Sequence, residues 1–191
     1  MIIDLIKLFE GYVRNYHTLS LTVYDDNQSI KRNEMEYFTK LGSMVGYQPY
    51  TMDTCDEIYG TMGLTWWDNN TNIHWNDFVL QVEREYIVEN DQITLEKLFS
   101  ERTYIPTNVI GIINVCNQER VYELIRITKQ ICNIKNALLV FKTRSTKSNH
   151  SICDTILAYL INENKIVTLQ TAYVKDSSGN LFMDFKKETG Q

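Results

Sequence analysis

The first part of the chain carries its apolar residues at helical spacing. Between residues 3 and 17 they fall on one face, which predicts an amphipathic helix built on Ile3, Ile6, Phe9, Val13 and Tyr16. A second helix is predicted to begin at Asn33, an N-cap candidate whose capping-box partner is Glu36, and to run to Val45. Gly46 suits the position that follows a helix C-terminus.

Strand patterns dominate the middle of the chain. Residues 59–67 and 75–86 are rich in Thr, Tyr, Trp and Val, and the turn-forming cluster 68–72 between them predicts an antiparallel hairpin. A short helix is predicted at 94–102. The continuous apolar run 108–115 is typical of a strand that is buried on both faces.

The last part of the chain continues the alternation of helix and strand. Asn117 is predicted to cap a helix, which is followed by a short buried strand at 137–141 and by three strand-like runs between 155 and 185. We therefore expect an α/β fold with a central mixed β-sheet flanked by helices on both faces and a C-terminal antiparallel meander. One domain spans 1–191, divided into an N-terminal helix and turn (1–32), a core (33–150) and the terminal meander (151–191).

The composition agrees with a globular domain, and the sequence also bears on the cellular compartment in which we expect the protein. The chain has 191 residues, of which 43% are apolar, so it can bury a sizeable core. No stretch of 18 apolar residues predicts a membrane span, and the charges of Asp4 and Lys7 in the apolar start argue against an export signal. The four cysteines form no C-x-x-C pair and are expected to be reduced thiols. These features predict a cytoplasmic protein without a membrane partner.

The distribution of charge points to one basic segment. The net charge is −5, yet residues 124–153 contain six basic residues and no acidic residue. Such asymmetry is typical of a basic groove on an acidic body, and it also arises by chance on a solvated face. Within this segment Lys142, Arg144 and Lys147 follow a predicted buried strand, where they either bind nucleic-acid phosphates or belong to an exposed loop.

An acidic pair marks the second strand of the predicted hairpin. Because a strand alternates its faces, Gln81, Glu83 and Glu85 point the same way, with about 6.6 Å between successive side chains. Two carboxylates at this spacing can bind Mg²⁺ or Mn²⁺, which prefer oxygen ligands. The alternative is a solvated strand end in which Arg84 pairs with a neighbour.

The order of these motifs resembles the PD-(D/E)xK restriction-endonuclease-like superfamily. The resemblance covers residues 33–115, with the strand at 137–141 as an extension. It lies in a helix that ends at Gly46-Tyr47, a strand with Gly63-Leu64-Thr65-Trp66-Trp67, a strand with Val82-Glu83-Arg84-Glu85, a helix with Leu95-Glu96-Lys97-Leu98, and a buried strand with Val109-Ile110-Gly111-Ile112-Ile113.

The resemblance implies metal-dependent hydrolysis of phosphodiesters in nucleic acid. Glu83 would take the second acidic position and Glu85 the position usually held by lysine, and both would bind Mg²⁺ or Mn²⁺. Lys97 would be the displaced lysine that stabilises charge in the transition state, and Glu36 a further metal ligand. The sequence departs from the family at Gly63, where the first strand would carry an aspartate, so the implied activity is feeble at most.

Two other functions remain open from the sequence. The same fold without catalysis would be a module that binds nucleic acid or a protein, including a second copy of the chain. An unrelated α/β interaction domain is the third hypothesis. Gly63 favours a non-catalytic relative, whereas the retained Glu83 and Glu85 favour the nuclease.

Overall fold

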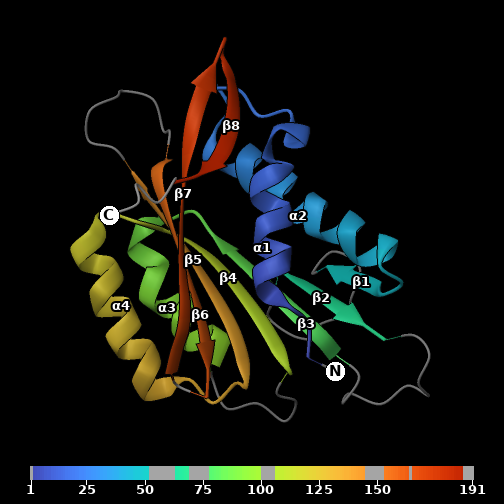
Figure 1. The fold of residues 1–191 in the computed structure, drawn as a ribbon, viewed down its shortest axis with the longest axis vertical. Coiled ribbons are helices and arrows are strands. Elements are labelled where there is room, and N and C mark those ends of the chain that lie inside the picture. Colours follow the sequence, from blue (N-terminus) through green and yellow to red (C-terminus); the bar gives the residue numbers. More distant parts are fainter. Residues whose placement is uncertain are drawn as a thin grey trace.

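One mixed sheet organises the molecule. The computed structural model describes residues 2–51, 63–68, 78–99, 106–144, 153–163 and 165–186. In these residues eight strands lie side by side in the order of the sequence (Figure 1). They are β1 (Gln48–Thr51), β2 (Leu64–Trp67), β3 (Phe78–Glu85), β4 (Asn108–Val115), β5 (Asn136–Arg144), β6 (Cys153–Asn162), β7 (Lys165–Ser177) and β8 (Asn180–Phe185).

The sheet changes from antiparallel to parallel and back. Strands β1, β2 and β3 are antiparallel neighbours, β3, β4 and β5 are parallel, and β5 to β8 are antiparallel again. The parallel steps are made by helical crossovers, as parallel pairing requires. The helices are α1 (Leu5–Arg14), α2 (Asn27–Met44), α3 (Asp91–Phe99) and α4 (Gln118–Ile131), with short 3₁₀ helices η1 (Tyr16–Leu19) and η4 (Val88–Asn90).

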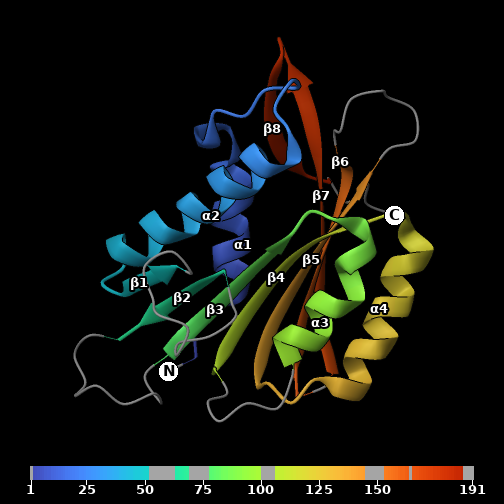
Figure 2. The ribbon, with the colours of Figure 1, turned by 180° about the vertical axis from the view of Figure 1, so that it is seen from behind.

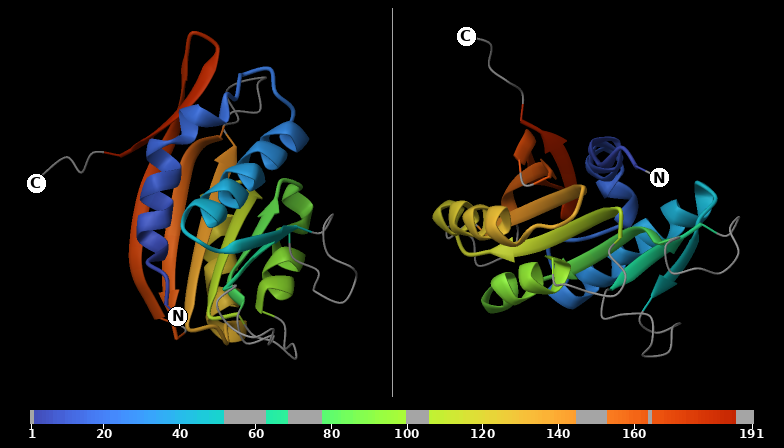
Figure 3. Two further views of the ribbon diagram at one scale, coloured as in Figure 1. Left: turned by 90° about the vertical axis from the view of Figure 1, so that its right-hand side faces the viewer. Right: turned by 90° about the horizontal axis from the view of Figure 1, so that it is seen from below.

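Two hydrophobic clusters lie on opposite faces of the sheet. Helices α1 and α2 pack on one face and α3 and α4 on the other (Figures 2 and 3). The alternation of side chains along β4 separates the clusters, because Ile110 and Ile112 belong to the first and Val109 and Ile113 to the second. Every residue of β4 is buried, which explains its uninterrupted apolar sequence.

The predicted class and strand pairing agree with the structure. The fold is α/β with a mixed sheet, β2 and β3 form the expected antiparallel pair, and β4 lies beside β3. The three C-terminal strands form the expected antiparallel meander. Residues 59–62, 69–77 and 100–102 of the predicted elements lie outside the described residues.

Helix α2 begins earlier than the sequence predicts. Its N-cap is Asp26, whose carboxylate accepts a hydrogen bond from the Ser29 N–H at 2.7 Å. Asn33 lies inside the helix, where its side-chain amide donates to the Leu19 carbonyl at 3.2 Å. The predicted division between residues 32 and 33 therefore falls within α2. The error arose because Asp26 and Asn33 are both residue types that cap helices. The helix begins at the earlier of the two.

Other local signals identified their positions correctly. The Asn117 side chain accepts from the Arg120 N–H at 2.8 Å and caps α4. Gly46 follows α2 with a φ of +93°, a conformation that glycine adopts without strain. Strand β1 was not predicted, since Pro49 interrupts its pattern; proline is tolerated there because β1 is an edge strand. Among the described residues, no helix has the length and apolar character of a membrane-crossing segment.

Candidate active site

Strand β3 presents its acidic residues to α3. Glu83 accepts a hydrogen bond from Lys97 of α3, and Glu85 lies beside Thr94 of the same helix. The two carboxylates therefore share one face of the strand, as its alternation predicts. Arg84, between them, points to the opposite face and pairs with Glu34 of α2.

Three residues singled out by the sequence meet at one carboxylate. Glu83 Oε2 accepts from the backbone N–H of Gly63 at 2.9 Å and from the Lys97 ammonium at 3.0 Å. The Glu83 side chain is 8% exposed and that of Lys97 is 30% exposed. A Cβ atom at Gly63 would lie 3.0 Å from Met35 Cε of α2 and 3.9 Å from Glu83 Oε2, so a side chain at position 63 would begin close to this carboxylate.

Close packing of α3 on β4 brings Lys97 to Glu83. Gly111 of β4 is the register partner of Glu83, and a Cβ at Gly111 would come within 2.6 Å of Leu98 Cδ1. The missing side chain lets Leu98 lie directly on the strand. Lys97, the preceding residue of α3, then reaches across to Glu83.

Glu85 is engaged with the chain that follows β3. Its Oε1 accepts from the Ile87 N–H at 2.7 Å, while Thr94 Oγ1 lies 3.5 Å from Oε2, at the limit of a hydrogen bond. The carboxylate of Glu85 thus stabilises the turn into η4 and α3. Among the described residues, no hydrogen-bond donor contacts both Glu85 and Glu83.

Glu36 is not part of this site. It lies on α2, which packs against the opposite face of the sheet, and its side chain is 55% exposed. Its Oε1 pairs with Lys40 Nζ at 2.7 Å, and this hydrogen bond lowers the pKa of the Glu36 carboxyl. The predicted metal role of Glu36 is wrong because the helix presents it to solvent, away from Glu83.

The structure also corrects the predicted role of Lys142. This residue lies in β5 with 1% of its surface exposed, so its ammonium cannot reach a nucleic-acid phosphate. It contacts the Glu34 carboxylate and lies 3.3 Å from the hydroxyl oxygens of Tyr12 and Tyr16. Arg144 ends β5, and its side chain, like the whole of Lys147, lies outside the described residues.

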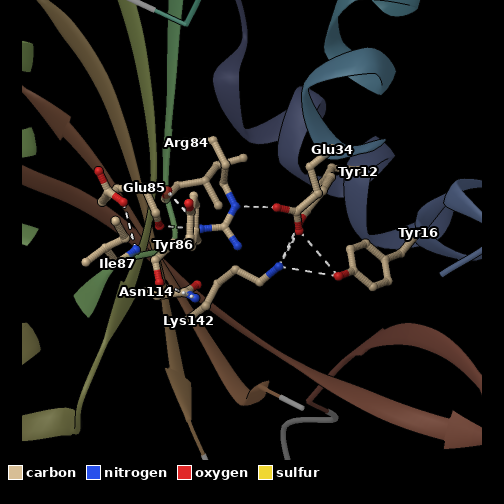
Figure 4. Close-up of polar contacts among 10 residues, drawn as sticks. Tyr12, Tyr16, Glu34, Arg84, Glu85, Tyr86, Ile87, Asn114 and Lys142 are labelled. Atoms are coloured by element: carbon tan, nitrogen blue, oxygen red, sulfur yellow. Dashed lines mark hydrogen bonds and ion pairs between the residues drawn. The ribbon is translucent and has the colours of Figure 1, made fainter. Parts of the chain in front are cut away.

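A buried ionic cluster around Glu34 was missed by the sequence analysis. Glu34 is fully buried and bonded to Arg84, Lys142 and the Tyr12 hydroxyl, the last at 2.6 Å (Figure 4). We call these residues, with Tyr16, the Glu34 cluster. Arg84 also donates to the backbone carbonyls of Glu85 and Ile112, the latter at 3.5 Å. The cluster thereby joins α1 and α2 to β3, β4 and β5.

The electrostatics of the Glu34 cluster favour the ionised carboxylate. Burial by itself raises the pKa of Glu34, but the Arg84 guanidinium and the Lys142 ammonium outweigh it and hold the pKa at about 2. Burial and the neighbouring Glu34 charge raise the pKa of Tyr12 well above its usual value. No local pattern marks Glu34 in the sequence, although the alternation of β3 does place Arg84 opposite Glu83.

The donors around Glu83 do not fit Mg²⁺ or Mn²⁺ as they stand. Glu83 Oε2 is already bonded to Gly63 and Lys97, and Glu85 is turned toward Ile87. Among the described residues no group of three His, Cys, Asp or Glu side chains could hold a metal ion. The Lys97 ammonium lies against Glu83, which among the described residues is the one buried carboxylate on this face of β3.

The comparisons with known proteins add no family. No protein-family model matches the chain, and no curated protein matches it significantly.

Proposed function

We propose that the protein is a PD-(D/E)xK-type, nuclease-like domain whose hydrolytic site is degenerate. Its ancestral reaction would be metal-dependent hydrolysis of phosphodiesters in nucleic acid, and cleavage by the present chain would be feeble at most. The carrying observation is that Gly63 and Lys97 both bond to Glu83 Oε2. These are the positions that the resemblance assigns to the first acid, the displaced lysine and the second acid.

The arrangement of elements supports the restriction-endonuclease-like core. Helix α2, the antiparallel strands β1 to β3, helix α3 and the parallel strand β4 follow in the order that the resemblance implies. Helix α4 and β5 extend the parallel part. The acidic position on β3 lies opposite the start of β2, because Leu64 is the register partner of Val82.

The residues of the site are better suited to neutralising the charge of a phosphate than to hydrolysing a phosphodiester. Lys97 is the more exposed member of the pair, so its ammonium is the group that could meet an anionic phosphate oxygen. Glu83, which is buried and accepts two hydrogen bonds, would position that ammonium. No second carboxylate stands at Gly63 to complete a set of metal ligands.

A non-catalytic binding module is the second candidate. It is favoured by the ammonium of Lys97 at 3.0 Å from Glu83, which neutralises the carboxylate without a metal. In this form the domain would bind nucleic acid or a protein through the same fold and hydrolyse nothing.

Restoring the missing acid tests the proposal. Gly63→Asp is sterically feasible, since the nearest atom to the new Cβ is the flexible end of Met35 at 3.0 Å and the backbone at Gly63 is not left-handed. We expect Gly63→Asp to cleave labelled single- and double-stranded DNA and RNA in Mn²⁺ faster than wild type. Gly63→Ala adds the Cβ without the acid and is the matched control.

The double variant Gly63→Asp with Glu83→Gln should lose the gain in cleavage. If folded Gly63→Asp cleaves no faster than Gly63→Ala on any of these substrates, the nuclease ancestry is wrong. The binding module would then be the better description of the protein.

A further inference from the structure

The first half of β7 is an open edge of the sheet. Strand β8 pairs with β7 only from Ala172 to Ser177, whereas β6 runs along β7 from Lys165 onward (Figure 1). Among the described residues, no strand therefore lies beside residues 165–170 on the side away from β6. The backbone groups that face outward there form a template for one more strand.

Thr171 shows which backbone groups face outward. Its carbonyl accepts a hydrogen bond from the Lys186 N–H at 2.9 Å, on the side of β8. Because inward- and outward-facing residues alternate along a strand, the N–H and C=O of Leu169 face the same side. The register shift between Leu160 and Ile161 of β6 puts residues 166–167 together in the next outward position. The open edge thus offers two consecutive outward positions for pairing.

The side chains of the open edge are apolar on the face of the sheet that carries α4. Leu169 lies on this face beside its register partner Tyr159, and its residue surface is 49% exposed. Ile166 and Val167 are 37% and 58% exposed. Proteins usually protect an open edge with charged residues or proline, and residues 166–170 contain neither. Exposed apolar side chains along an unpaired strand are typical of an interaction surface.

The face that carries α1 has complementary polar groups at the two ends of the same edge. At one end, Lys165 is exposed and forms no ion pair among the described residues. At the other end, Gln170 interacts with Glu10 of α1, whose side chain is 24% exposed. The buried Oε1 of Gln170 has no hydrogen-bond partner among the described residues. A free cation and a pair of acceptors therefore lie at opposite ends of residues 165–170.

We propose that a second copy of the chain pairs with this edge, β7 against β7, about a twofold axis at Thr168. The two strands then run antiparallel, and every contact occurs twice, as in any twofold interface. On the α4 face, Leu169 of each copy lies opposite residues 166–167 of the other. On the α1 face, Lys165 lies opposite Gln170. Apolar side chains thus meet apolar side chains, and the two eight-stranded sheets join into one.

Charge and hydrogen-bond complementarity single out a second copy as the occupant. An extended peptide of any sequence could pair with the backbone of the open edge. A second β7 in this register also brings the Lys165 ammonium to the Glu10 carboxylate and to the unpaired Gln170 Oε1, once in each direction. Lys165 is the one charged residue among residues 165–170, so no like charges oppose each other across the two strands.

The association state of the full chain tests the inference. In sedimentation velocity we expect wild type to dimerise at about 10–100 µM, since one short strand pairing makes a small interface. Leu169→Lys places an ammonium against residues 166–167 of the other copy, twice in each dimer, and should raise the dissociation constant at least about tenfold. Ile93→Lys is the matched control, because Ile93 is 63% exposed on α3, and it should dimerise like wild type.

Exchanging the two charges tests the proposed register. Lys165→Glu sets a carboxylate against Glu10 of the other copy, and Glu10→Lys sets an ammonium against Lys165, so each should weaken the dimer about two- to tenfold. The double variant restores opposite charges and should dimerise more tightly than either single variant. Lys40→Glu, on an exposed part of α2, is the control and should dimerise like wild type.

A cysteine on the twofold axis tests the same register covalently. Thr168 would lie opposite itself in a non-hydrogen-bonded pair, where the two Cα atoms are about 4.5 Å apart, within the range of a disulfide. Mild oxidation of Thr168→Cys should therefore give a covalent dimer on a non-reducing gel. Wild type, with its four native cysteines, is the control and should stay monomeric on that gel. Adding Leu169→Lys should suppress the cross-link.

A wild-type chain that remains monomeric up to about 200 µM would overturn the inference. A dimer that folded Leu169→Lys leaves unchanged would overturn it as well, because the copies would then meet through another surface. Assemblies larger than a dimer would show that the edge does not close about a twofold axis. These measurements involve no nucleic acid, so their outcome is independent of the proposed function.

Discussion

Glu83 and Arg84 are adjacent in β3, and their side chains leave the strand on opposite faces to form two separate ionic clusters. Glu83 pairs with Lys97 on the side of α3, and Arg84 pairs with Glu34 on the side of α2. The Glu34 cluster is buried and ties helices to the sheet, whereas the Glu83 site opens to solvent through Lys97. Two adjacent residues of β3 thus belong to a structural anchor and to a candidate site for chemistry.

Removing the charge of Glu34 is expected to destabilise the protein strongly. Glu34→Gln leaves Arg84 and Lys142 buried without a counterion, and breaking such a pair costs about 3–5 kcal/mol. The free energy of unfolding is measured with urea. Glu36→Gln, on the exposed side of the same helix, is the control and should unfold like wild type. Equal losses in the two variants would contradict the role of the cluster.

The stabilisation by Glu34 should disappear in acid. The pKa of Glu34 is lowered from 4.5 to about 2 on folding, so its contribution is fully present above about pH 4.5 and is lost as the pH falls toward 2. The shift corresponds to about 3 kcal/mol. The difference in unfolding free energy between wild type and Glu34→Gln, followed from pH 6 to pH 2.5, should therefore shrink. A difference that is constant over this range would show that Glu34 is not ionised in the folded protein.

Lys142 is expected to affect stability and not nucleic-acid binding. Lys142→Met removes a buried ammonium but leaves Glu34 paired with Arg84, so we expect a loss of about 1–3 kcal/mol. Binding to DNA, measured at low salt by fluorescence anisotropy on folded protein, should be the same as for wild type. Lys129→Met, an exposed change on α4, serves as the control for loss of one positive charge. Weaker DNA binding by folded Lys142→Met alone would mean that its ammonium reaches a phosphate.

A side chain at Gly111 is expected to destabilise the protein. In Gly111→Ala the new Cβ would lie 2.6 Å from Leu98 Cδ1 and 3.0 Å from Leu139 Cδ2, and such overpacking costs about 1–3 kcal/mol. Leu98 belongs to α3 and is buried, so we expect it to move outward in Gly111→Ala and to weaken the contact of Lys97 with Glu83. Gly11→Ala, whose Cβ would lie 3.4 Å from the Tyr37 hydroxyl, should instead stabilise α1 by about 0.5–1 kcal/mol. Urea unfolding should show a lower free energy of unfolding for Gly111→Ala and a higher one for Gly11→Ala.

Several features of the fold and the site could be predicted because their causes are local. The alternation of β3 places Glu83 and Glu85 on one face, and the apolar run of β4 marks a strand buried on both faces. The side chain of Asn117 caps the helix that follows it. The approach of Lys97 to Glu83 was expected only from the resemblance to a family, since no local rule joins a helix to a particular strand residue.

The sequence by itself determined where the main helices and strands lie, because their periodicities and caps involve residues within a turn or two of one another. Only the tertiary structure decided which charges meet. Lys142 reaches Glu34 across 108 residues, and the register of β4 and β5 together with the packing of α2 sets that contact. Its long-range partner turned a residue that looked like a phosphate ligand into a buried counterion, since burial of a charge is tolerated only beside an opposite charge.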